Sequence, residues 1–191
     1  MEIDRSLNLV VTVDRDPGPS LYVHSMPISR EVFEANFLVI SKTFASIYNQ
    51  GLGWNIGPRV AGMMLKKIAQ DDGVWPEVEL SLVNEIRRLS SVSYPDPEGG
   101  GWRSMPLYTA VTQGILTADE AAEAENPITF FIVASAMHKK RELQPILQGG
   151  LVRVWDAQIT SLSSTEFTAG LPTLKETGST GEKAPPSSIP V

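Results

Sequence analysis

The chain has 191 residues, 42% of them hydrophobic, and its 16 basic and 22 acidic side chains leave a formal net charge of −6. A chain of this length can bury one sizeable core, so one domain with a tail is the simplest organisation. The acidic balance disfavours nucleic acid and anionic membranes as partners, and the absence of cysteine excludes disulfides, thiolate nucleophiles and cysteine-bound zinc.

The N-terminal sequence MEIDRSLNLVV lacks the basic start and unbroken apolar core of a signal peptide. No apolar run approaches the roughly 20 residues that a membrane-spanning helix needs. We therefore expect a protein that stays in the cytoplasm where it is made, with no membrane partner.

The chain opens with the pattern of a β-hairpin. Apolar residues alternate along residues 7–13, residues 14–19 (DRDPGP) have turn chemistry, and residues 21–24 (LYVH) resume a β-favouring run. A lone hairpin is marginal in water, so we expect these strands to pair with another strand or pack against helices.

Three amphipathic helices are predicted next. The first follows Ser29 and ends near Gly51, the second opens at Pro58 and the third opens at Pro76. Each has an apolar stripe, so each is expected to pack against a partner.

The prolines and glycines of residues 94–101 (YPDPEGGG) then indicate an exposed loop. Trp102 and residues 106–111 are predicted to form a short helix. Thr117 and Glu120 have the spacing of a capping box that leads into a helix over residues 121–125.

The next segment, from Pro127 to Met137, is apolar almost all round and predicts a helix buried through the middle of the domain. Pro145 is expected to end or kink this helix. From Leu151 the apolar spacing changes and favours a strand over residues 151–160, which could join the N-terminal hairpin.

The C-terminal segment has the composition of a flexible tail, since 12 of its last 21 residues are Pro, Gly, Ser or Thr. The sequence thus predicts an α+β domain over residues 1–168, with about five or six helices and a small antiparallel sheet, and a flexible tail over residues 169–191. The apolar stripes predict the following core positions: Phe37, Ile40, Phe44, Leu65, Leu82, Ile86, Phe131 and Val133.

No catalytic or metal-binding pattern is present. His24 and His138 have no motif partner, and Asp14 with Asp16 is better explained by turn formation than by a metal site. The acidic residues at the start of the third helix suit the helix dipole, and no GxSxG elbow occurs. We therefore expect no enzyme activity, no catalytic residue, no cofactor and no metal.

Two further patterns have structural explanations. The glycines of GLGWNIGP (residues 51–58) lack the Lys-Ser/Thr of a phosphate loop and follow a helix, so they are interpreted as connector residues. The basic residues 139–141 suit the end of a helix, and a nucleic-acid face would need more of them.

Six segments in order resemble the tail assembly chaperones of long-tailed bacteriophages. They are LNLVVTV with LYVHSMPISREVFE over residues 7–34, GPRVAGMMLKKIA from Gly57, LVNEIRRLSSV from Leu82, GWRSMPL from Gly101, NPITFFIVASAMHKK from Asn126 and SLSSTEFTAGLPT from Ser161. None is a catalytic signature, so the resemblance depends on the ordered set, which spans most of the chain.

The resemblance implies a binding role in the host cytoplasm during tail morphogenesis. Proteins of this family are expected to coat the tape-measure protein and to help recruit tail-tube subunits. We expect Phe167, Leu171 and Leu174 to contact a partner, because they are apolar anchors in and near a mobile tail.

Two other functions stay open. One is a structural tail or neck subunit retained in the virion, which would use the N-terminal hairpin for strand pairing between copies; the other, less favoured, is an enzyme of unknown class. The sequence also leaves open whether copies of the chain associate and whether a frameshifted longer product exists.

Overall fold

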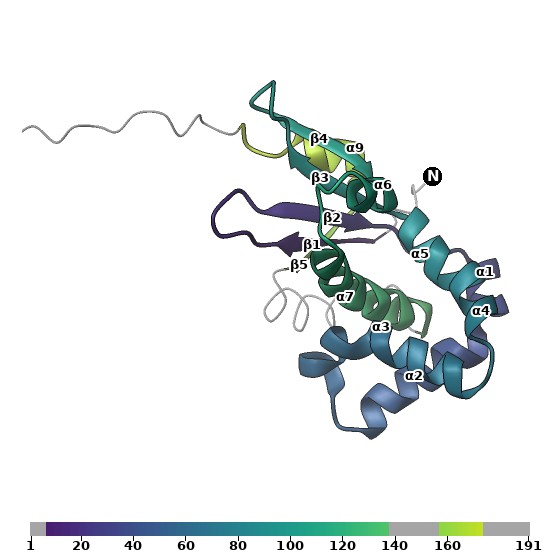
Figure 1. Ribbon diagram of the computed structural model, residues 1–191. Coiled ribbons are helices and arrows are strands. Elements are labelled where there is room, and N and C mark those ends of the chain that lie inside the picture. The colour runs from purple at the N-terminus through teal and green to yellow at the C-terminus, as the bar shows by residue number, and fades with distance from the viewer. Residues whose placement is uncertain (1–6, 138–156, 174–191) are drawn as a thin grey trace, which may run out of the picture.

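The computed structural model describes residues 7–137 and 157–173, which form an α+β fold (Figure 1). The elements are β1 (Asn8–Val13), β2 (Leu21–Ser25), α1 (Arg30–Ala35), α2 (Phe37–Asn49), α3 (Gly53–Asp71), α4 (Trp75–Val78), the π-helical turn η1 (Glu79–Val83), α5 (Asn84–Arg88), β3 (Ser90–Pro95), β4 (Trp102–Pro106), α6 (Leu107–Thr112), α7 (Ala118–Met137), β5 (Ala157–Thr160) and α9 (Ser164–Ala169).

The strands form one antiparallel sheet in the order β4-β3-β2-β1-β5. The predicted hairpin is confirmed, with Val11 opposite Val23, and so is its pairing with a late strand, because Leu9 lies opposite Ile159. The earlier part of the predicted late strand lies outside the described residues. The hairpin strands β1 and β2 therefore lie inside the sheet.

The predicted loop and the predicted short helix are both present with other bounds, and the helical assignment of Trp102 is wrong, since β3 and β4 form a second hairpin here. The Asp96 amide donates to the Gly101 carbonyl (2.8 Å), which closes a shorter loop. The serines of SSVSYP carry little strand propensity, and pairing with β2 on one side and β4 on the other places them in the sheet. The helix is present, but it starts later, at Leu107.

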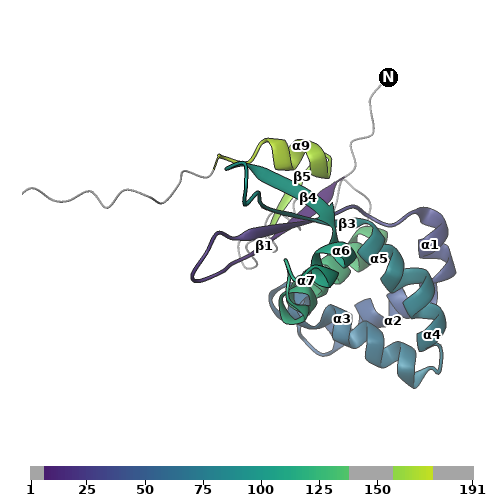
Figure 2. The same cartoon turned by 45° about the horizontal axis from the view of Figure 1, so that its top comes forward.

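Helix α7 lies against one face of the sheet, with α3 and α2 on its far side, while α9 covers the opposite face (Figures 1 and 2). Each of the residues Phe130, Phe131, Ile132 and Val133 is at most 1% exposed. Four consecutive buried side chains point to every side of a helix, so α7 is enclosed as predicted.

Helix α7 differs from its prediction in starting at Ala118 and running through Pro127 without a break. The predicted capping box at its start is confirmed: Glu120 N donates to Thr117 Oγ1 (3.2 Å), and Thr117 N donates to Glu120 Oε2 (2.8 Å). The two predicted helices on either side of Pro127 are therefore one.

The first predicted helix is instead divided in two at Asn36. The backbone of Asn36 leaves the helical region (φ −112°, ψ 16°), and its side chain donates to the Val32 carbonyl (2.9 Å), to which its own backbone amide also donates (3.2 Å). The third predicted helix is likewise interrupted, because the π-helical turn η1 lies between α4 and α5.

Helix α3 begins at Gly53, so Pro58 lies inside it and the interpretation of Gly57 as a connector residue is wrong. A Cβ atom at Gly57 would lie 2.7 Å from Phe130 Cε2 and 2.8 Å from Ile47 Cγ2. Glycine at this position therefore lets α3 approach α7 and α2 closely.

Most of the predicted core is confirmed. Buried positions include Ile40, Leu65, Leu82, Ile86, Phe131 and Val133. Phe44 is only partly buried. The prediction that Phe37 lies in the core is wrong, because its side chain is 48% exposed. The prediction assumes one continuous helix with a single apolar stripe. Because a new helix starts at Phe37, this residue does not lie on the buried side of that stripe.

Two Phe→Ala substitutions test this assignment. Phe131→Ala should lower the free energy of unfolding by about 3–5 kcal/mol, because it removes a fully buried ring, whereas Phe37→Ala should cost less than about 1.5 kcal/mol. Urea unfolding of both variants at one pH measures the difference. Equal costs would contradict the enclosed position of α7.

Candidate functional site

A groove lies between the segment that leads into α1 and the last two turns of α7. Its volume is about 420 Å³. Its lining residues are Pro27, Ile28, Ser29, Arg30, Phe33, Glu34, Ile132, Ser135 and Ala136. The lining is mainly apolar with a charged rim, as in sites that bind an apolar side chain from a partner.

The apolar surface continues from the groove onto α2. Phe33, which lines the groove, makes an edge-to-face contact with Phe37 (ring centroids 5.7 Å apart). Met137 is 38% exposed and its sulfur lies 3.9 Å from Ser41 Oγ of α2. Groove and helix surface are therefore contiguous.

Two strongly exposed leucines extend this surface. Leu38 is 73% exposed and Leu80 is 75% exposed. They belong to different elements that meet where Ser81 Oγ donates to Asn36 Oδ1 (2.9 Å). We call the groove together with Phe37, Leu38 and Leu80 the apolar face.

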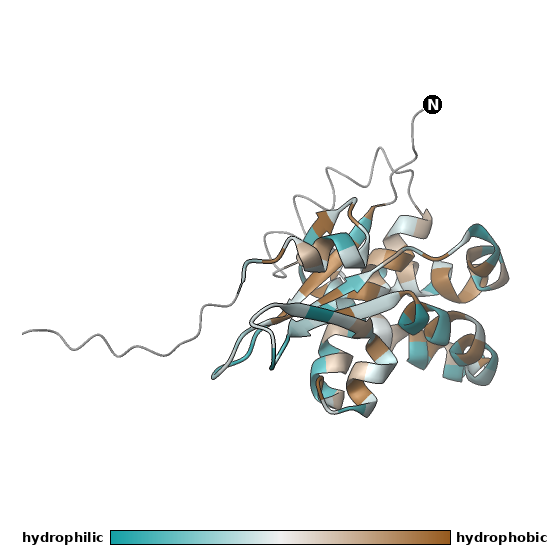
Figure 3. Ribbon diagram, turned by 90° about the horizontal axis from the view of Figure 1, so that it is seen from above, coloured by the Kyte–Doolittle hydropathy of each residue, from teal (hydrophilic) through white to brown (hydrophobic). Residues whose placement is uncertain are grey.

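Local sequence explains why these side chains point outward. Ser29 caps α1 by accepting from the Val32 amide (3.3 Å), and Asn36 ends it, so α1 is too short to bury a full stripe. In η1 the wide turn keeps Val78 and Leu82, four residues apart, toward the core and leaves Leu80 outside. Figure 3 shows hydrophobic and hydrophilic colours alternating on the helices at its right, where Figure 1 places α1, α2 and α4.

Sequence reasoning missed the apolar face, although a signal was present. The run Phe37, Leu38, Val39, Ile40 has more apolar residues than one helix face can bury, and only the last two are buried. The apolar stripe predicts Phe37 in the core and gives Leu38 no role, whereas both side chains are exposed.

The residues predicted to contact a partner have different positions. Phe167 of α9 is only 8% exposed, packed on the sheet near the rings of Tyr22 (5.7 Å) and His24 (6.3 Å). Leu171 is half-buried, and Leu174 lies outside the described residues. Phe167 can contact a partner only if α9 leaves the sheet.

Polar contacts also hold α9 in place. The Ser93 and Thr168 hydroxyl oxygens lie 2.6 Å apart in a buried position, and Trp102 Nε1 donates to the Pro172 carbonyl (2.8 Å). The expected tail boundary after Thr168 therefore falls inside α9, and residues up to Pro172 contact the domain.

His24 is 1% exposed, and its Nε2 lies 3.0 Å from the Leu162 carbonyl. Burial lowers the pKa of His24 below its ordinary 6.5, so the ring is neutral at pH 7 and Nε2–H donates to the carbonyl. This arrangement anchors the segment before α9. His138 and the basic residues 139–141 lie outside the described residues.

Two of the remaining sequence candidates, Asp14 and Glu85, have structural partners. Asp14 accepts from the Ser20 hydroxyl (2.7 Å), as expected in a turn, and Glu85 pairs with Arg88 (2.6 Å), which lowers the pKa of that carboxyl. Within residues 7–137 and 157–173, no group of three or more His, Asp or Glu side chains is placed to hold a metal ion.

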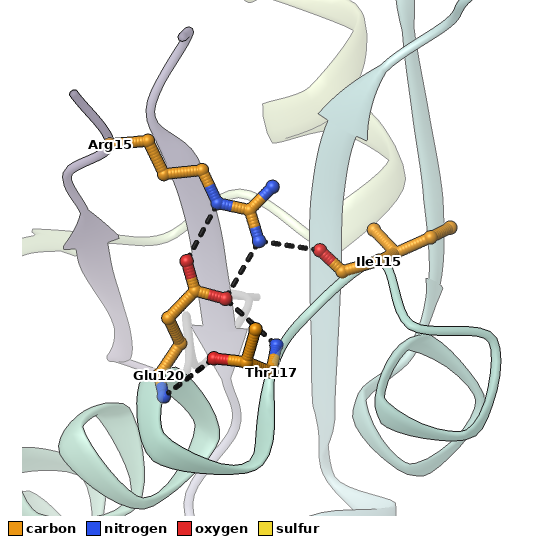
Figure 4. A network of polar contacts seen from close by, with 4 residues as sticks. All are labelled: Arg15, Ile115, Thr117 and Glu120. Atoms are coloured by element: carbon orange, nitrogen blue, oxygen red, sulfur yellow. Dashed lines mark hydrogen bonds and ion pairs between the residues drawn. The ribbon is translucent and has the colours of Figure 1, made fainter. Parts of the chain in front are cut away.

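A buttress of polar contacts joins the β1–β2 hairpin to the start of α7 (Figure 4). The Arg15 guanidinium donates to both carboxylate oxygens of Glu120 (2.7 Å each) and to the Ile115 carbonyl (2.6 Å). Hydrogen bonding to Arg15, aided by Thr117, lowers the pKa of Glu120 from 4.5 to about 2. These groups bond to one another across two distant segments of the chain, so we interpret their role as structural.

The chain matches no protein-family model, no curated protein and no solved structure with which it was compared. Among the described helices, none combines the length and apolar character needed to cross a membrane.

Because of the Arg15–Glu120 contact, we expect part of the free energy of unfolding to be lost at acidic pH. A depressed carboxylate pKa stabilises the fold above the unfolded value of 4.5, and this contribution is lost as pH falls toward about 2. Glu120→Gln should therefore cost about 1 kcal/mol near pH 6, and the difference from the parent should shrink below pH 4.5. Urea unfolding of both proteins across this range measures it; a difference that is constant with pH would contradict the assignment.

Proposed function

We propose that this protein is a non-catalytic tail assembly chaperone that binds the tape-measure protein in the host cytoplasm and helps recruit tail-tube subunits. The observation that carries the proposal is the apolar face, which offers exposed Phe37, Leu38 and Leu80 beside a groove. The sequence resemblance supplies the biological context.

The physical argument concerns an aggregation-prone client. A long helical protein with an uncovered apolar stripe associates with itself unless a partner covers the stripe. A groove between helices with protruding leucines can accept such a stripe, since a helical client satisfies its own backbone hydrogen bonds and needs only side-chain contacts.

A structural subunit of the virion is the second candidate, but its proposed mode of assembly does not fit the fold. The hairpin strands β1 and β2 are both paired on two sides within the sheet, so they have no free edge for pairing between copies. Mass spectrometry of purified virions separates the two functions: a chaperone is absent from the particle, whereas a structural subunit is present in stoichiometric amounts.

Co-expression with the tape-measure protein tests the binding role. The double substitution Leu38→Gln and Leu80→Gln should leave the chaperone folded and reduce the soluble client by about tenfold, because two exposed apolar contacts are lost. Tyr108→Gln is the matched control, since Tyr108 is also 73% exposed but belongs to α6. Equal client solubility with all three proteins would overturn the proposal.

Within the same function, we assign tail-tube recruitment to the C-terminal segment that contains Phe167, Leu171 and Leu174. Because Phe167 is buried on the sheet, recruitment requires α9 to detach. The chain has no cysteine, so Ser93→Cys with Thr168→Cys would place one reversible disulfide across the 2.6 Å hydroxyl contact.

The oxidised double-cysteine variant should lose binding to the tail-tube protein in calorimetry and keep binding to the tape-measure protein. Reduction should restore the lost binding, because α9 is free again. Ser93→Cys alone is the control for the substitution. Undiminished tube binding by the oxidised variant would remove α9 and Phe167 from this role.

A further inference from the structure

The charges around the apolar face define its partner more closely, on the premise that the proposed function is correct. Glu77 and Glu79 lie immediately before Leu80, and Glu31 and Glu34 lie beside Phe33 on α1; all four carboxylates belong to exposed residues. Two cations, Arg30 and Lys42, occur within α1, α2, α4 and η1. Arg30 pairs with Glu34 (2.6 Å) and Lys42 pairs with Asp72 (2.5 Å).

The two cations are thus each used by a carboxylate of the protein itself. Glu31 and Glu77 have no ion pair within the described residues, and Glu79 acts at longer range on Arg87, which is already bound to Glu125 (2.7 Å). Among the described residues, the charges left unpaired around the apolar face are therefore negative. A partner that places cations beside its apolar residues gains attraction there, whereas an acidic partner is repelled.

The secondary structure of the partner follows from what surrounds the groove. The apolar face is built from helices, and in the described part of the chain the edges of the sheet are β4 and β5, which belong to another layer (Figure 2). An extended peptide would find no row of unpaired backbone groups on helices. A helix brings its own backbone hydrogen bonds and presents apolar side chains at intervals of three and four residues.

We infer that the apolar face binds an amphipathic helix whose apolar stripe is flanked by lysine or arginine. Leucine-sized side chains of that helix occupy the groove beside Phe33 and Ile132, while the flanking cations face Glu31 and Glu77. Since the carboxylates of Glu31 and Glu77 are exposed, their pairing with the flanking cations contributes mainly to selectivity and association rate. The apolar contacts supply most of the affinity.

Three synthetic helical peptides of about 18 residues test the inference. They share one leucine stripe and carry lysine, glutamine or glutamate at the flanking positions. The full-length protein should bind the lysine peptide about tenfold more tightly than the glutamine peptide, and should not measurably bind the glutamate peptide. Raising NaCl from about 0.05 M to about 0.5 M should remove the advantage of lysine.

Variants of the protein test which residues produce the preference for the lysine peptide. Glu31→Gln with Glu77→Gln should abolish the preference for the lysine peptide, while Leu38→Gln with Leu80→Gln should weaken every peptide. Glu98→Gln with Glu123→Gln makes the same change in charge on exposed residues elsewhere and should have no effect.

Equal binding of the three peptides, or equal effects of the two charge variants, would overturn the inference. Dimerisation of the protein that the Leu38→Gln and Leu80→Gln variant abolishes would overturn it in favour of a second copy as the occupant. If the peptides behave as predicted while the natural tape-measure protein does not bind, the proposed function fails and the binding chemistry of the face stands.

Discussion

The fold depends on enclosing one helix on every side. Four consecutive residues of α7, from Phe130 to Val133, are buried, so the sheet must cover one side and α2 with α3 the other. Covering α7 closely requires glycine at position 57, because a larger residue would hold α3 away from the Phe130 ring. The buttress between Arg15 and Glu120 fixes the start of the same helix to the hairpin that covers it. Central burial therefore determines the position of the surrounding elements.

A central helix also determines which surfaces stay uncovered. The helices around α7 use their inner sides for the core. The short elements α1 and η1 and the first turn of α2 have apolar residues left over, which contribute to the apolar face. The opposite layer of the molecule has a different character: α9 is a six-residue helix held by one buried ring and a few polar contacts. In the described part of the chain, Phe37, Leu38 and Leu80 of the apolar face are exposed, whereas the ring of Phe167 is covered. This difference is the basis for assigning the two partners to two regions.

The elements with strong local signals could be predicted from the sequence. The N-terminal hairpin alternates clearly, and the enclosed segment of α7 is apolar all round, so both were identified. The strands β3 and β4 could not be, because β3 (SSVSYP) is rich in serine and β4 (WRSMP) is short and has a single central apolar residue. Their strand state comes from pairing, of β3 with β2 and of β4 with β3. The break at Asn36 was missed because the apolar spacing continues across it, while the backbone of this one residue leaves the helical region. That break exposes Phe37, so the candidate site was missed with it.

The central claim is that the apolar face holds the client, and hydrogen exchange of the protein with and without a tape-measure fragment tests it most directly. Binding should slow exchange of backbone amides in α1, the first turns of α2 and η1, because a docked helix excludes water from these exposed turns. Amides of β4 and of α6 should exchange at unchanged rates. Protection confined to the sheet edges or to α9, with none in α1 and η1, would contradict the account.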